Sequence, residues 1–351
     1  MDYKQFLQDL LRATAQNGAS DLHISPGHYP TIRVDGRLIQ LSDQKILDPE
    51  TSQGLVFALL DDKKDRFLSE KELDFSYTFG ENRFRANAYQ THNGFAAALR
   101  LVPNEIKSIE DLGLPSVLKI FSKLSQGFVL VVGPTGHGKS TTLAALINSI
   151  NKERTEKIVT IEDPIEYIFS PDKSVIDQRE VYQDTFSFHK ALRATFRENV
   201  NVIMVGELRD YETMSAAVSA AETGHLVFAS LHTNSASQTV ERIIDSFPSN
   251  QQPQIRAQLA STLSGVISQR LLPRVKGGLI PAVEVMIATP AVRTLIRDSR
   301  PKQLDLVIET GQDVGMISLE RSLADLVRRK EISIDKAEFY SLNPTEFRNL
   351  L

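Results

Sequence analysis

The feature that most constrains the fold of this chain is a glycine-rich segment over residues 133–140. It fits the pattern G-x-x-x-x-G-K-[ST] at every required position. An apolar run over residues 128–132 precedes it, and a run of good helix formers over residues 141–146 follows it. A strand, a glycine-rich loop and a helix in this order bind phosphate, because backbone N–H groups and the positive end of the helix converge on the phosphate oxygens. The segment therefore predicts a nucleotide site.

The loop residues carry the expected contacts with the nucleotide. Lys139 and Ser140 are expected to serve the β- and γ-phosphates and a magnesium ion. A guanine-specifying Asn-Lys-x-Asp motif is missing, since residues 151–154 have Arg154 in place of the Asp, so ATP with Mg²⁺ is favoured. The nucleotide-binding set predicted from the motif and the helix that follows is Gly133, Pro134, Thr135, Gly136, His137, Gly138, Lys139, Ser140 and Thr141.

Acidic residues follow two further apolar runs. The cluster 162–166 comes after the run 158–161, and the cluster 207–210 comes after the run 202–205 and Gly206. On its own such a cluster is more often a solvated turn or a helix cap, but a phosphate-binding loop in the same sheet favours catalysis, since strands carry catalytic groups at their carboxyl ends. One carboxylate would support the magnesium ion and another would orient the attacking water. The candidate metal ligands are Ser140, Glu162, Asp163 and Glu207.

Two histidines flank another apolar run, over residues 226–231. His232 follows the run, so it is expected beside the γ-phosphate, where an imidazole can sense or polarise the terminal phosphate. His225 precedes the run and is also assigned to the nucleotide site.

Composition narrows the classes of protein. At 351 residues, two domains are expected. A formal net charge of −4 argues against a general nucleic-acid coat protein, so bulk nucleic-acid binding is not expected. The absence of cysteine excludes disulfides and cysteine-ligated zinc and fits the cytoplasm. No apolar run approaches the roughly 18 to 20 residues that span a bilayer, so direct membrane insertion is not expected.

The patterns along the chain divide it into two domains and a linker. Alternating runs over residues 31–39, with a turn at Asp35 and Gly36, and over residues 74–102 predict a smaller α+β domain over residues 1–103. Residues 104–115, with two prolines nearby and Gly113, are expected to form the linker. The following short apolar runs, separated by helical patterns, predict a buried and mostly parallel sheet, hence an α/β domain over residues 116–351.

This set of motifs resembles the secretion ATPases of type II, type IV and related systems. In chain order it comprises the phosphate-binding loop, an Asp box over residues 160–166, a Walker B motif over residues 206–210 and a His box over residues 223–233. Within that group the chain most resembles the pilus retraction ATPases. Only one domain precedes the motor, the paired-cysteine zinc motif is missing, and residues 291–297 (Ala-Val-Arg-Thr-Leu-Ile-Arg) resemble the signature Ala-Ile-Arg-Asn-Leu-Ile-Arg.

The resemblance implies a RecA-like P-loop motor domain behind a PAS-like α+β domain. It further implies a homohexamer that powers type IV pilus retraction and twitching motility, and that is cytoplasmic and attached to the inner membrane through a platform protein. By position, the catalytic base is Glu166, the Walker B glutamate is Glu207 and the γ-phosphate histidine is His232. Arg83 and Arg85 match basic residues that approach ATP from the amino-terminal domain.

Departures and alternatives accompany this resemblance. His137 stands where serine is usual, at a position expected to be unconstrained. A pilus assembly or type II secretion ATPase would share the chemistry, although the missing cysteines count against it. A DNA-translocating ATPase is disfavoured by the negative net charge and by the presence of the Asp box and the His box. A nucleotide-sensing adaptor that no longer hydrolyses ATP is disfavoured, because the catalytic residues are intact: Lys139, Ser140, Glu166 and Glu207.

The signature segment is expected to begin a helix, with Thr289 as N-cap and Pro290 in the first turn. Its apolar residues would share one face and its arginines, Arg293, Arg297 and Arg300, another. Following the resemblance, we expect this helix to transmit nucleotide-driven motion to the pilus platform or between subunits.

Overall fold

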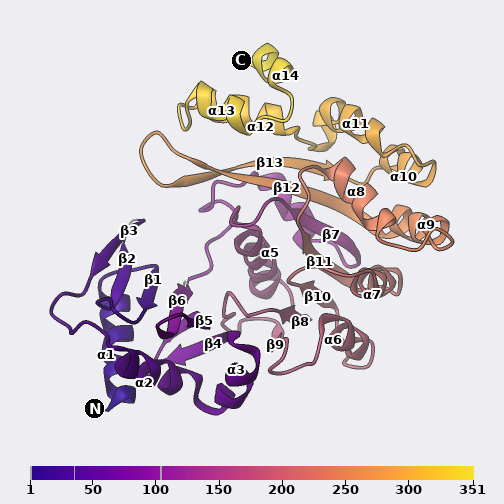
Figure 1. Ribbon diagram of the computed structural model, residues 1–351. Helices are drawn as coiled ribbons and strands as arrows, with labels where there is room; N and C mark the ends of the chain where they lie inside the picture. Colours follow the sequence, from indigo (N-terminus) through magenta and orange to yellow (C-terminus); the bar gives the residue numbers. More distant parts are fainter. Residues whose placement is uncertain (1, 35, 103–104) are drawn as a thin grey trace. The chain divides into compact units, whose positions relative to one another are not determined.

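The computed structural model describes residues 2–34, 36–102 and 105–351 (Figure 1). The chain divides into two compact units, the first running up to Glu105 and including Pro164–Ile168, the second comprising Ile106–Asp163 and Phe169–Leu351. Sequence patterns assigned residues 164–168 to the second domain, whereas their contacts place them in the first unit. Asp35 of the predicted turn and the predicted domain boundary at residues 103 and 104 fall outside the described residues.

The first unit packs helices against an antiparallel sheet. Among its described residues the strand order is β3-β2-β1-β6-β5-β4. Leu7 and Leu11 of the first helix and Leu55 of the second are fully buried in one core with strand residues such as Phe84. This arrangement confirms the predicted α+β class. The elements are α1 (Tyr3–Gln16), β1 (Asp21–Ile24), β2 (Thr31–Val34), β3 (Arg37–Gln40), α2 (Pro49–Leu60), α3 (Lys64–Glu70), β4 (Glu72–Phe79), β5 (Asn82–Thr91) and β6 (Gly94–Val102).

The second unit is built on a mostly parallel sheet. Its described strands lie in the order β13-β12-β7-β11-β10-β8-β9. All neighbouring pairs are parallel except β12 and β13, which form an antiparallel hairpin. Every residue of β7 and β11 is buried, as near-continuous apolar runs predict. The strands are β7 (Gly127–Val132), β8 (Lys157–Glu162), β9 (Val175–Glu180), β10 (Val202–Val205), β11 (Leu226–Leu231), β12 (Leu263–Pro273) and β13 (Leu279–Ile287).

Helices connect these strands, and a separate group of helices follows the last one. Leu272, Ile280 and Phe347 belong to a second core of this unit, which joins the hairpin β12–β13 to the carboxyl-terminal helices (Figure 1). In the described part of the chain, no helix is long and apolar enough to cross a membrane. The helices are α4 (Lys119–Ser122), α5 (Lys139–Glu153), α6 (Phe188–Thr195), α7 (Tyr211–Glu222), α8 (Ala236–Asp245), α9 (Gln252–Thr262), α10 (Pro290–Arg297), α11 (Leu304–Thr310), α12 (Leu319–Arg328), α13 (Ile334–Tyr340) and α14 (Pro344–Leu350).

The signature helix α10 begins as expected, because the side chain of Thr289 accepts a hydrogen bond from the N–H of Val292. The predicted basic face is wrong in one respect. The helix ends at Arg297, and Ser299 adopts a left-handed backbone with φ of 60°, so Arg300 does not continue the face. Arg293 is also engaged within the fold, since its guanidinium donates to backbone carbonyls of Ala288, Ala260 and Ser261.

We predict that Arg293→Ala destabilises the protein, because carbonyls at the end of α9 lose a charged hydrogen-bond donor. The expected cost is about 1.5 to 3 kcal/mol in the free energy of unfolding, measured by urea denaturation. Arg297→Ala is the matched control on the same helix, since its side chain is exposed. Equal stability of the two variants would contradict this structural role for Arg293.

Candidate active site

The phosphate-binding loop can be formed only with glycine at its first position. Gly133 has φ of 147°, a value that L side chains rarely adopt. A Cβ atom at Gly133 would lie 2.4 Å from the backbone oxygen of Gln269 in the neighbouring strand β12. Gly136 and Gly138 also have positive φ values, of 79° and 80°. The loop therefore turns sharply out of β7 while packed directly on β12.

Lys139, the first residue of α5, is buried and folds back over the loop. Its Nζ atom donates to the carbonyls of Gly133 at 2.9 Å and Pro134 at 3.0 Å. The same Nζ lies 3.4 Å from Nδ1 of His232, and the hydroxyl of Thr135 lies 3.3 Å from that nitrogen. Because β11 pairs with β7, the residue that follows β11 lies beside the loop that follows β7. The structure thus brings His232 to Lys139, as the strand-end argument predicts.

Charged side chains from two further strand ends extend this cluster. Nε2 of His232 lies 3.6 Å from a carboxylate oxygen of Glu207, which follows β10. Arg209 pairs with Glu207 and also donates to Asp163, after β8, at 3.3 Å. The carboxyl edge of the sheet therefore carries one connected row of side chains: Lys139, His232, Glu207, Arg209 and Asp163. Sequence reasoning did not assign Arg209 to the site, although it stands within the Walker B motif.

Electrostatics favour a neutral imidazole at His232. Burial lowers the pKa of His232, the positive charge of Lys139 lowers it further, and Glu207 opposes both effects. Its partners suit the tautomer in which Nε2 carries the proton and points to Glu207, while Nδ1 can accept from Lys139 or Thr135. The hydrogen bond with Glu207 is the main reason why the pKa of Arg209 is raised.

Glu162, another predicted metal ligand, lies buried within the sheet. One of its carboxylate oxygens accepts hydrogen bonds from the hydroxyl of Thr160 at 2.7 Å and from the amide of Gln178 at 3.3 Å. The bond from Thr160 lies within β8, and the bond from Gln178 joins β9 to β8. Glu162 is thus less available to a metal ion than Asp163 and Glu207, which reach Arg209 at the strand ends.

Magnesium fits the donor set of this edge. Across residues 2–34, 36–102 and 105–351, no group of three or more His, Asp or Glu side chains could hold a metal ion alone. Mg²⁺ is typically held by one or two protein oxygens together with nucleotide phosphates and water. A hydroxyl at Ser140 and carboxylates at Asp163 and Glu207 are the kind of oxygen donors that it prefers.

His137 is constrained by β12, contrary to the expectation from sequence. Its Nδ1 accepts the N–H of Leu271 at 3.0 Å, and its carbonyl accepts the side-chain amide of Gln269 at 2.7 Å. Burial lowers the pKa of His137, which keeps the nitrogen available as an acceptor. The expectation failed because β12 was not predicted as a strand.

The hairpin β12–β13 also supports the segment that follows His232. The guanidinium of Arg270 donates to the carbonyl and the side-chain oxygen of Asn234, at 3.1 and 3.0 Å. The carboxylate of Glu284 accepts the N–H of Ala236 at 2.7 Å, at the start of α8. Glu284 is buried, and this burial raises its pKa to about 7.

His225 lies at the other end of β11 from His232. Because β11 spans Leu226–Leu231, the two histidines are separated by about 20 Å of extended chain. Nδ1 of His225 lies 3.0 Å from the carbonyl of Ala220, and its ring packs against Phe196. The assignment of His225 to the nucleotide site of its own chain is therefore not supported by its position, because the two ends of one strand cannot meet.

Glu166, Arg83 and Arg85 belong to the first unit. The guanidinium of Arg85 lies 3.6 Å from the carboxylate of Glu166, and Arg83 donates to the hydroxyl of Ser76 at 2.7 Å. The two arginines alternate along β5, so they point to the same face of its sheet. The predicted base and one predicted nucleotide contact are thus neighbours, and their roles stay predictions.

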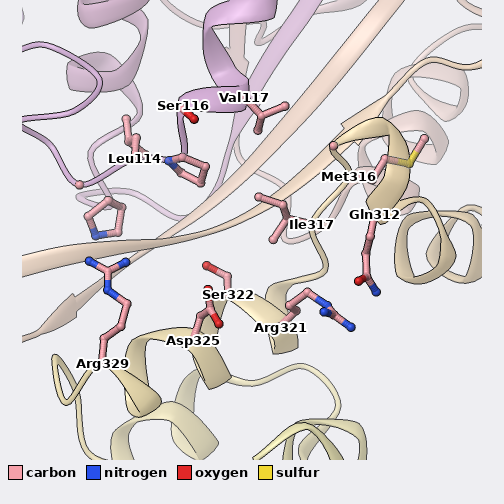
Figure 2. A pocket seen from close by; sticks show the side chains of 14 residues that line it. Leu114, Ser116, Val117, Gln312, Met316, Ile317, Arg321, Ser322, Asp325 and Arg329 are labelled. Carbon is pink, nitrogen blue, oxygen red and sulfur yellow. The ribbon is translucent and has the colours of Figure 1, made fainter.

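A cavity of about 530 Å³ occupies another part of the second unit (Figure 2). Residues 113–117 and side chains near the start of α12, among them Arg321 and Ser322, line it. No residue of the loop 133–141 does. The cavity is therefore separate from the phosphate-binding edge.

The buried sheet, the phosphate-binding loop after β7 and the charged row at its edge define a RecA-like P-loop ATPase. The chain belongs to the family of Type II/IV secretion system proteins, whose model matches residues 3–295. It is 42% identical over 343 residues to the type IV pilus retraction ATPase PilT of Pseudomonas aeruginosa, covering 97% of this chain and 99% of that protein. It is 43% identical over 310 residues to a twitching motility protein of Neisseria gonorrhoeae, covering 88% and 83% of the two chains.

A solved structure gives the same result for the fold. The crystal structure of the pilus retraction motor PilT with bound ADP superimposes with a TM-score of 0.91. The match covers 97% of this chain and 98% of that one, at 42% identity. Both findings confirm the family resemblance that the motifs indicated.

We predict that Gly133→Ala abolishes tight nucleotide binding, because the new methyl group meets the backbone of β12 and the residue must leave its φ of 147°. An affinity loss of about tenfold or more is expected, because the backbone strain is worth about 1 to 3 kcal/mol and the contact of the methyl group with β12 adds to it. Titration with a fluorescent ADP analogue measures it. Gly136→Ala is the matched control: it also has a positive φ, but a Cβ there meets nothing within 4 Å. Equal losses in both variants would show that the contact with β12 is unimportant.

We predict that Glu284→Gln makes stability less dependent on pH. The folded-state pKa of Glu284, about 7, lies above its ordinary 4.5, so its contribution to stability is present below pH 4.5 and is lost as pH rises through 7. Glutamine keeps the acceptor for the N–H of Ala236 but does not ionise. Urea midpoints of the wild type should therefore fall more between pH 5 and pH 8 than those of the variant. Parallel pH profiles would contradict the buried, titrating carboxyl.

Proposed function

We propose that this chain is an ATP-hydrolysing motor that powers type IV pilus retraction and so twitching motility. The observation that carries the proposal is the match to the pilus retraction motor PilT over nearly the whole length of both chains, in sequence and in fold. The cluster of Lys139, His232 and Glu207 supports the ATPase chemistry, since these are the groups that a P-loop enzyme needs around a γ-phosphate.

The proposed division of chemical roles follows the positions of these side chains. Lys139 and the loop N–H groups bind the β- and γ-phosphates. A ring N–H of His232 donates to the terminal phosphate once the nucleotide is bound, and Glu207 positions the ring. Glu166 accepts the proton of the attacking water, as the resemblance implies. A magnesium ion held by Ser140, with Glu207 and Asp163 in its shell, would neutralise phosphate charge.

The proposed assembly is the one that the family resemblance implies. We expect a homohexamer in the cytoplasm, attached to the inner membrane through a platform protein of the pilus machinery. Arg83 and Arg85 are proposed nucleotide contacts, and α10 remains a proposed element of coupling. A ring makes hydrolysis depend on assembly, so activity should rise with protein concentration until the oligomer is complete.

Deleting the gene and counting surface pili tests the direction of the motor. Loss of a retraction motor should leave cells with abundant pili and no twitching. Loss of an assembly or secretion motor should leave cells without pili or with normal pili, and either result would reject the proposal. Adding single-stranded DNA to the purified ATPase is a second check, because a DNA-translocating enzyme would be stimulated.

We predict that Lys139→Ala lowers ATP turnover by at least a hundredfold, because phosphate charge loses its buried cation. The same variant should fail to restore twitching when expressed in the deletion strain. Lys152→Ala is the matched control, since Lys152 lies on the same helix α5 and is exposed. Hydrolysis by Lys139→Ala within a few fold of the control would remove Lys139 from the catalytic set.

A further inference from the structure

Strand β12 carries two consecutive polar side chains that are almost completely buried. Gln269 and Arg270 are only 3% and 5% exposed. Burying an amide or a guanidinium costs free energy unless each polar atom finds a partner, so such residues are rare within a central strand. Because neighbouring side chains of a strand point to opposite faces, the two residues serve different surroundings. Arg270 contacts the segment after His232, and Gln269 contacts the phosphate-binding loop.

The amide of Gln269 joins the loop to the helix that follows it. Its nitrogen donates to the carbonyl of His137 at 2.7 Å, two residues before Lys139. Its oxygen accepts from the hydroxyl of Thr142 at 2.7 Å, in the first turn of α5. Both bonds are short, and they give the amide nitrogen and the amide oxygen a partner each. One side chain thus connects the loop to the start of the helix.

The backbone around Gln269 adds two further contacts with the same loop. Its carbonyl oxygen lies 2.4 Å from the place that a Cβ of Gly133 would take, so β12 approaches the start of the loop too closely for a side chain there. The N–H of the next residue, Leu271, donates to the ring of His137. One strand segment therefore holds the loop at its first residue and near its last.

We propose that Gln269 is a positioning residue of the nucleotide site. It keeps the loop N–H groups and Lys139 in the geometry that phosphate requires, and it acts through His137 and Thr142. The inference rests on the proposed function, because it presumes that the loop binds and hydrolyses ATP. Preorganised donors bind phosphate without a cost of rearrangement, which is why a loosened loop weakens binding.

The test compares nucleotide binding and hydrolysis in the full chain. Gln269→Met keeps the length of the side chain but can neither donate to His137 nor accept well from Thr142. We expect the dissociation constant of a fluorescent ADP analogue and the KM for ATP to rise about tenfold or more, the equivalent of one or two buried hydrogen bonds. Thr142→Val should have a smaller effect in the same direction, and Thr142→Ser, which retains the hydroxyl, should bind as the wild type does.

The double variant Gln269→Met/Thr142→Val separates a bridge from two independent contacts. If the bridge positions the loop, the double variant should bind no more than about twofold more weakly than Gln269→Met alone, since both changes break the same connection. Losses that multiply would overturn the proposal. So would wild-type affinity in Gln269→Met with only a lower urea midpoint, because that is the behaviour of a purely structural residue.

The outcomes also separate this inference from the function on which it rests. A wild-type chain that hydrolyses ATP, together with an unaffected Gln269→Met variant, rejects only the role of Gln269. A wild-type chain that binds no nucleotide rejects the proposed function itself. If Gln269→Met does not fold, the pair Thr142→Val and Thr142→Ser decides, and equal affinity of these two variants overturns the proposal.

Discussion

The packing of the phosphate-binding loop against strand β12 is the contact on which the rest of the site depends. At Gly133 the chain leaves β7 so close to the backbone of Gln269 that no side chain fits between them. This approach aims the loop along the edge of the sheet and puts Lys139 at the start of α5 over the loop carbonyls. His232 and the groups beyond it contact the site through that lysine. The close approach at Gly133 therefore affects the position of the whole site.

The strand order then determines which chemical groups meet. Because β11 lies between β7 and β10, the residues that follow these three strands, His232 among them, line up on one edge. The row joins groups of different charge: Lys139 is positive, burial favours the neutral form of His232, Glu207 is negative and Arg209 is positive. A neutral imidazole can accept a hydrogen bond from the lysine and donate one to the carboxylate. A bound phosphate would compete for these bonds, so the ring is suited to change partners when a phosphate binds.

Local patterns predicted much of this arrangement. The phosphate-binding motif, the apolar runs of β7, β8, β10 and β11 and the carboxylates after them are features of consecutive residues. Strand order is not, because it depends on which surfaces pack in three dimensions. The His box illustrates the limit, because a single motif spans both ends of β11. His232 lies beside the phosphate-binding loop, as expected, whereas His225 was assigned to an edge that it does not reach. Gln269 has no local signal of function, since only a tertiary contact brings it to the phosphate-binding loop. Arg209 stands in the Walker B motif, but its contact with Asp163 depends on the tertiary fold.

The hairpin β12–β13 escaped prediction for a reason that is itself informative about function. Its first strand is interrupted by Ser268, Gln269 and Arg270, which break the apolar pattern of a buried strand. Each of the three donates a hydrogen bond to a segment at the active edge. Gln269 donates to the phosphate-binding loop, and Ser268 and Arg270 donate to Asn234. Glu284 on β13 does the same for the start of α8. Burying polar side chains in a strand costs free energy unless they form hydrogen bonds. The bonds of this strand go to segments at the active edge, so its polar residues indicate that it supports those segments.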